Sequence, residues 1–262
     1  MRGNRADHHR QSHKDSGAVS LHIIIIMKKH IPNTITCCNL ISGSIAVVFA
    51  IWGHFEMALL FIVIGAVFDF FDGMAARLLG VSSPIGKELD SLADDITFGL
   101  APAAMVYTQL NTMEYPSGLP MAVQCVIPFM AFIIAAFSAL RLAKFNLDER
   151  QTSSFIGVPT PANALFWASI IAQYNFTLLC SSPYMVYVIL ALILLTSWLL
   201  VAEIPLFALK FKHWGFKGNE VKYLFLASSV LILLSSVLIG YAAIAAVIAW
   251  YVILAAVTCR KK

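Results

Sequence analysis

Apolar residues occupy most of this chain in long runs, and polar residues or breaks containing Gly and Pro separate the runs. Each run is near the ~20 residues that a helix needs to cross a bilayer. A lipid-exposed backbone must satisfy its own hydrogen bonds, which favours helices. The pattern therefore predicts an all-α, polytopic transmembrane bundle. Its about eight predicted spans are 33–53, 55–80, 88–110, 120–143, 160–180, 184–205, 221–238 and 241–258.

Lysine and arginine residues fall in alternate connections between these spans. The basic residues after the leader are Lys28, Lys29, Arg77, Lys87, Arg141, Lys144, Arg150, Lys210, Lys212, Lys217, Lys222, Arg260, Lys261 and Lys262. The opposite connections, near 54, 111–119, 181–183 and 239–240, contain no Lys or Arg. By the positive-inside rule the basic side is cytoplasmic, and an even number of spans places both termini there.

Composition agrees with a membrane protein. The chain has 262 residues, of which 60% are hydrophobic and 12% charged, and its mean hydropathy is +0.81. Soluble domains carry about 25% charged residues. No basic face or aromatic RNA-reading motif is present, so we expect no nucleic-acid partner. The five cysteines show no metal-ligand spacing, which argues against a zinc or redox site.

The first 26 residues differ from the rest of the chain. They are mostly polar, and their short apolar patch ending at Met27 is too short to span a bilayer. No small-residue cleavage site follows, as a signal peptide would require. We expect residues 1–26 to be a disordered extension or a start-site artefact, and 27–262 to form a single integral membrane catalytic domain.

Five aspartates gather at the end of the second predicted span and the start of the third. Asp69 and Asp72 are three residues apart, and Asp90 and Asp94 are four apart, so each pair shares a helix face. A short turn joins the two helices, so the pairs can point at one another. Asp95 lies one residue off the face of Asp90 and Asp94, and we leave it out of the core set as a supporting or interface residue.

Four carboxylates at this position need compensation. One ionised carboxylate deep in a bilayer costs roughly 2.5–3.5 kcal/mol, so four would cost on the order of 10 kcal/mol by simple addition. Arg77 alone cannot neutralise them. Two divalent cations can, and carboxylate oxygens suit Mg²⁺ or Mn²⁺. Gly73 and Ala76 leave a groove poor in side chains, and Gly86 lets the turn approach it.

The residues Asp69, Asp72, Gly73, Ala76, Arg77, Gly86, Asp90 and Asp94 fill the pattern D-x-x-D-G-x-x-A-R, eight residues, G-x-x-x-D-x-x-x-D. This pattern resembles the signature of the CDP-alcohol phosphotransferases. The resemblance implies a six-helix core with two helices added. It also implies that Asp69, Asp72 and Asp90 hold the metal ions. Asp94 would assist there and act as the base.

Further stretches resemble the phosphatidylserine synthase branch of that family: IPNTITCCNLISG, SLADDITFGLAPA, SALRLAKFN and FIGVPTPANA. The resemblance implies transfer of a phosphatidyl group from CDP-diacylglycerol to L-serine, with release of CMP. It implies a homodimer in membrane lipid, in a bacterial cytoplasmic membrane.

Candidate contacts to the substrates follow from residue type. Gly73, Ala76, Arg77, Gly86, Asn33 and Thr36 are candidates for the nucleotide and phosphates, with Asn39 assigned to hydrogen bonds between helices. Serine carries a carboxylate and an ammonium. Arg141 or Lys144 could meet the carboxylate or the diphosphate, and Asn146 could meet the ammonium.

Two alternatives remain open at the level of sequence. The same chemistry could use glycerol 3-phosphate or an inositol phosphate, although such acceptors need more basic residues than this region offers. A divalent-cation transporter would also use acids, but it predicts them near mid-membrane on several helices rather than at one end of two.

Overall fold

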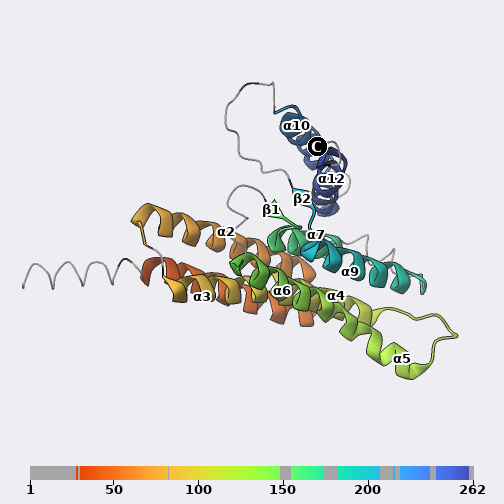
Figure 1. Cartoon of the computed structure of the whole chain (residues 1–262). Coiled ribbons are helices and arrows are strands. Elements are labelled where there is room, and N and C mark those ends of the chain that lie inside the picture. The colour runs from red at the N-terminus through yellow and green to blue at the C-terminus, as the bar shows by residue number, and fades with distance from the viewer. Residues whose placement is uncertain are drawn as a thin grey trace, which may run out of the picture.

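The computed structural model describes residues 28, 30–81, 83–147, 155–173, 182–206, 215, 219–236 and 240–259. Helix occupies part of each predicted span, which confirms the all-helical prediction (Figure 1). The predicted extension at 1–26 lies outside the described residues. The helices are an N-terminal helix (His30–Ile51), α2 (Phe55–Leu79), α3 (Pro84–Asp94), α4 (Ala101–Thr112), α5 (Met121–Val126), α6 (Ile133–Leu147), α7 (Thr160–Ala172), α9 (Met185–Val201), α10 (Glu220–Leu234) and α12 (Ala242–Cys259).

Two short segments join these helices into longer rods. The π-helical segment η1 (Asp95–Leu100) continues α3 into α4, and the 3₁₀ segment η2 (Ile127–Phe132) continues α5 into α6. The only strands among the described residues are β1 (Phe155–Ile156) and β2 (Pro205–Leu206), which pair antiparallel.

Among the described residues, three helical rods are long and apolar enough to cross a membrane. They are His30–Ile51, Phe55–Leu79 and Met121–Leu147, with 22, 25 and 27 residues. Many large apolar side chains on the bundle surface are exposed, among them Ile41, Phe70 and Trp198. An apolar exterior of this kind is expected where lipid replaces water as the solvent. The molecule is thus a helical membrane bundle.

The turn between α2 and α3 brings two acidic segments together. Gly80 ends α2 in a left-handed conformation with φ of 62°, where its N–H meets the carbonyls of Ala76 and Arg77. Glycine adopts this conformation without steric cost, which suits it to a helix end. Ser83 then caps α3, since its hydroxyl accepts a hydrogen bond from the Gly86 N–H at 3.0 Å. These two caps make the turn short and fix its direction.

The interior of the bundle centres on α4 and α7. The η1–α4 rod is buried along most of its length, with Phe98, Met105 and Leu110 among its least exposed residues. It packs against η2 and α7. Trp167 of α7 is fully buried, and its indole N–H donates to the Thr196 hydroxyl of α9 at 3.0 Å.

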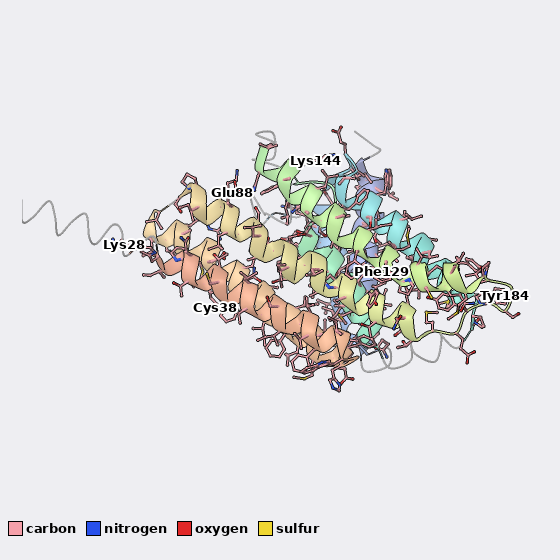
Figure 2. All side chains as sticks on the ribbon, turned by 90° about the horizontal axis from the view of Figure 1, so that it is seen from below. Lys28, Cys38, Glu88, Phe129, Lys144 and Tyr184 are labelled. Atoms are coloured by element: carbon pink, nitrogen blue, oxygen red, sulfur yellow. The ribbon has the colours of Figure 1, made fainter. Side chains whose placement is uncertain are left out.

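The last two helices stand apart from this core. Figure 1 shows α10 and α12 on one side of the bundle, running across the direction of the other helices. α12 packs on α7 and α10 packs on α12. In Figure 2, Lys28, Glu88 and Lys144 lie toward one end of the bundle and Tyr184 lies at the other. Lys28 and Lys144, which the sequence predicts on the same side of the membrane, therefore lie toward the same end of the bundle.

Candidate metal centre

Three carboxylates meet where α2 ends and α3 begins. Asp69 and Asp72 come from the cytoplasmic-predicted end of α2, and Asp90 comes from α3. One oxygen from each lies within 4.8 Å of the others. The antiparallel turn and the spacing of three residues on α2 produce this convergence.

The composition of this cluster fits a hard divalent cation. All its donors are carboxylate oxygens, the ligands that Mg²⁺ and Mn²⁺ prefer. In the described part of the chain, none of the three carboxylates forms an ion pair, and one oxygen of Asp90 is buried without a hydrogen-bond partner. A group of ionised acids without counter-charges is costly within a bilayer, and a bound cation would offset that cost.

Asp72 is the most enclosed of the three. It is buried, and the hydroxyl of Thr36 on the N-terminal helix donates to its Oδ2 at 2.6 Å. This bond orients the carboxylate from the side of the N-terminal helix. Thr36, a candidate nucleotide contact from the sequence, therefore also holds a member of the cluster.

Asp94 lies one helical turn deeper than Asp90 and outside this group of three. It is buried, with 8% of its surface exposed. The side-chain amide of Asn39 donates to its Oδ1 at 3.1 Å, and the Asn39 oxygen accepts from the Thr97 hydroxyl at 2.8 Å. This chain of hydrogen bonds fixes the Asp94 carboxylate between two helices.

Two glycines make that chain possible. A Cβ on Gly43 would lie 2.2 Å from the Thr97 hydroxyl oxygen. A Cβ on Gly65 would lie 2.5 Å from the Thr97 methyl group and 2.9 Å from the Asn39 amide oxygen. The N-terminal helix, α2 and η1 can approach this closely only because both positions lack a side chain. Sequence reasoning missed Thr97, Gly43 and Gly65, because their contacts depend on packing between helices.

A cavity of about 270 Å³ opens beside Asp72 and Asp90. It brings together the sequence candidates Asn33, Thr36, Gly73, Ala76 and Gly86, and a Cβ on Gly73 would meet nothing within 4 Å. The sequence did not single out its remaining lining residues as ligand contacts, and these are Pro32, Val81, Ser83 and Lys87.

Arg77, Arg141, Lys144 and Asn146, the candidate phosphate and serine contacts, do not line this cavity. Arg77 is exposed near the end of α2, and Lys144 is exposed on α6 (Figure 2). Arg141 is buried, with Nη1 at 3.4 Å from the Thr160 hydroxyl and its guanidinium 5.2 Å from the Phe145 ring centre.

Asn146 connects α6 to α3. Its side-chain amide donates to the Ser91 hydroxyl at 2.7 Å, and its carbonyl accepts from the Lys87 ammonium at 2.8 Å. The side-chain nitrogen of Asn146 is therefore engaged with Ser91, whereas an ammonium would need its side-chain oxygen as acceptor.

The sequence profile of the CDP-alcohol phosphatidyltransferase family matches residues 29–209, which include every residue of the metal centre. The chain belongs to this family. This match confirms the family resemblance that the acidic pattern predicted. Helices α10 and α12 lie beyond the matched region.

Several relatives carry the name CDP-diacylglycerol–serine O-phosphatidyltransferase. The Bacillus subtilis (strain 168) protein is 36% identical over 147 residues, which cover 56% of this chain and 77% of the relative. The Helicobacter pylori (strain ATCC 700392 / 26695) protein is 37% identical over 137 residues, covering 51% of this chain and 54% of the relative. The Mycobacterium leprae (strain TN) protein is 33% identical over 150 residues, covering 54% and 46%. The similarity thus spans about half of this chain.

Proposed function

We propose that this membrane protein transfers the phosphatidyl group of CDP-diacylglycerol to the hydroxyl of L-serine, giving phosphatidylserine and CMP. The observation that carries the proposal is the convergence of Asp69, Asp72 and Asp90 within 4.8 Å beside a cavity, with Asp94 one turn deeper. The names of the relatives support serine as the acceptor.

The three converging aspartates would hold the metal, two Mg²⁺ or Mn²⁺ ions, with Asp94 assisting. Bound there, the ions would neutralise charge on the diphosphate of the lipid substrate. The protein contributes the fixed position of the ligands, since Thr36 orients Asp72 through a 2.6 Å hydrogen bond. Preorganised groups of this kind avoid reorganisation during the reaction.

The cavity beside the aspartates would receive the cytidine and the phosphates. Gly73 and Ala76 present a surface without bulky side chains, against which a flat ring can lie. Asn33, Thr36 and Gly86 line the same cavity. Arg77 would meet phosphate at its edge, and the acyl chains would remain in the bilayer.

Asp94 would act as the general base. Its carboxylate takes the proton of the serine hydroxyl, the serine oxygen forms a bond to the lipid-side phosphorus, and the bond from that phosphorus to CMP breaks. Asn39 holds one oxygen of Asp94, at 3.1 Å, and keeps the carboxylate in a fixed orientation for this transfer.

Arg141 is the strongest candidate contact for the serine carboxylate, because it is buried and lies within electrostatic reach of Asp94. Lys144 and Asn146 lie one turn or more further along α6, toward the end of the bundle near Lys87. The basic end of the bundle would face the cytoplasm, with both termini on that side, in a bacterial inner membrane. The enzyme would work as a homodimer.

The experiment that tests the function is an acceptor panel. The purified protein is incubated with CDP-diacylglycerol and Mn²⁺ or Mg²⁺, and CMP release is compared for L-serine, glycerol 3-phosphate and inositol 1-phosphate. We expect release with serine and little with the other two. Release with a phosphorylated acceptor alone would reassign the acceptor, and absence of release with all three would overturn the proposal.

A further inference from the structure

A second polar cluster lies on the other side of Asp94, and the catalytic scheme leaves it unused. It contains Asp95 of η1, Ser138 and Arg141 of α6, and Thr160 and Asn163 of α7. Four of these five residues are buried, and Asp95 is half-buried. The three helical segments that carry them pack against one another.

Polar atoms in this cluster lack partners. One carboxylate oxygen of Asp95, the Ser138 hydroxyl and the Asn163 amide nitrogen are buried and form no hydrogen bond with any residue that the structure describes. Buried polar groups in folded proteins are nearly always hydrogen-bonded, so three without partners on three helical segments that pack together need an explanation. A small polar ligand that binds there supplies one.

The register between η1 and α6 places Asp95 opposite Leu142, the chain neighbour of Arg141. Asn146 bonds Ser91, and Ser138 lies against Gly99, where a Cβ would be 3.0 Å from the Ser138 Cβ. The two helices are antiparallel, and Asp95 is midway between Ser91 and Gly99. The opposite position on α6 is therefore midway between Ser138 and Asn146, at Leu142, one residue from Arg141.

Asp95 also points into this interface. Its Oδ1 would be 2.6 Å from a Cβ on Gly99, so the carboxylate occupies the space that the glycine leaves open next to Ser138. Asp94, its neighbour in the chain, instead faces Asn39 of the N-terminal helix.

The two charged groups of the cluster have opposite sign, and neither has a close ion pair. Among the residues that the structure describes, neither Asp95 nor Arg141 forms an ion pair. The Arg141 guanidinium has only a long hydrogen bond, 3.4 Å, to the Thr160 hydroxyl. Arg141 lies within electrostatic reach of Asp94, but a buried charge without a close ion pair is costly unless a partner binds it.

A zwitterion satisfies both charges at once. We infer that the acceptor subsite takes a zwitterionic amino alcohol, whose ammonium binds the Asp95 carboxylate and whose carboxylate binds the Arg141 guanidinium. The inference rests on the proposed function and identifies the acceptor class by charge. A phosphorylated acceptor has no ammonium for Asp95, and its dianion is repelled there.

The test measures how strongly the enzyme requires the ammonium. Serine is compared with 3-hydroxypropanoate, which keeps the hydroxyl and carboxylate but lacks the amine. The measured quantity is kcat/KM for serine divided by kcat/KM for 3-hydroxypropanoate. We expect the wild-type ratio to fall by at least about tenfold in Asp95→Asn, because a charge-assisted contact is lost. KM for CDP-diacylglycerol should stay unchanged, which a merely structural role of Asp95 would not predict.

Glu88→Gln is the matched control. It removes the same charge from the same rod, but Glu88 is exposed and lies outside the cluster (Figure 2). Its ratio should match the wild-type ratio within about twofold, as for most surface substitutions. An Asp95→Asn ratio equal to the control ratio would overturn the inference.

A second variant covers the case in which Asp95→Asn does not fold. Gly99→Ala keeps every charge but puts a methyl group where the Asp95 carboxylate lies. The same ratio must fall there as well, and an unchanged ratio contradicts the inference. A wild-type enzyme that releases no CMP with serine marks failure of the proposed function instead, whereas activity with an unchanged ratio marks failure of this inference alone.

Discussion

Asp94 and Asp95 are adjacent in the chain and differ in every contact. Asp94 is buried and held by Asn39, which Thr97 holds in turn. Asp95 turns toward α6, where one of its oxygens has no partner within the described residues. Groups with a fixed orientation suit a chemical step, and groups left open suit a ligand. The difference supports our proposal that Asp94 takes the proton and that Asp95 recognises the acceptor.

The strongest test of this division is Asp94→Asn. The amide keeps the size of the side chain but cannot take a proton, so kcat should fall by about 10²- to 10⁴-fold, as for loss of a general base. The fall should be equal for every acceptor, unlike that of Asp95→Asn. Steady-state CMP release on detergent-purified protein measures it, and gel filtration checks folding. Retained turnover would remove Asp94 from the role of base.

Removal of the metal should abolish activity as well, but reversibly. The triad of Asp69, Asp72 and Asp90 would lose its bound cations to EDTA, and added Mn²⁺ or Mg²⁺ should restore turnover. Ca²⁺ at the same concentration serves as the comparison, because it prefers longer bonds and more ligands. Full activity in excess EDTA would contradict a metal centre at these aspartates.

Asn39→Ala tests whether the support of Asp94 matters. The variant removes the hydrogen bond to Asp94 and leaves the Thr97 hydroxyl only the Asn39 backbone carbonyl as acceptor. We therefore expect kcat to fall by about 10- to 100-fold, the usual effect of losing a partner of an active-site ligand. KM for serine should change little. Ser44→Ala is the control, since Ser44 is exposed on the same helix and bonds only the Leu40 carbonyl. Equal kinetics of the two variants would show that Asp94 needs no support.

Gly65→Ala tests the close approach that this support requires. The added methyl group would meet Thr97 and Asn39 at less than 3.0 Å, so overpacking should cost about 1–3 kcal/mol of stability. Gly73→Ala places the same change on the same helix where nothing lies within 4 Å, and it should be neutral or slightly stabilising. Thermal unfolding in detergent compares the two. A Gly65→Ala midpoint equal to that of Gly73→Ala would contradict the close approach.

Ser138→Ala should give the smallest effect. Loss of one hydroxyl beside Asp95 should raise KM for serine by about two- to tenfold, the value of a single hydrogen bond. Stability should not fall, because the hydroxyl has no partner in the described structure. Substrate titrations and unfolding curves measure the two effects. A loss of stability with unchanged KM would make Ser138 a packing residue.

The sequence predicted the helices and the acidic cluster because both follow local rules. Apolar runs of membrane length predict helices without any knowledge of their packing. Spacings of three and four residues place Asp69 with Asp72 and Asp90 with Asp94 on shared faces. The short turn capped by Gly80 and Ser83 then brings the pairs together. The pattern also allowed the correct family resemblance.

Features that depend on packing between helices could not be read in this way. Asn39 was expected to bond between helices, but only the structure identifies Asp94 as its partner. Asp95 was set aside because it lies off the face of Asp94, and the role inferred for it depends on α6. The π-helical segment η1 falls inside a span predicted as regular helix, because the apolar pattern carries no signal for one extra residue in a turn.

The most direct test of the whole account follows labelled serine into lipid. Purified full-length protein receives CDP-diacylglycerol, Mn²⁺ and labelled L-serine, and the label in the chloroform-soluble phospholipid is measured together with CMP. The account predicts that labelled lipid and CMP form in equal amounts, and that neither forms with Asp94→Asn or without CDP-diacylglycerol. Folded wild-type protein that leaves all label in the aqueous phase would contradict it.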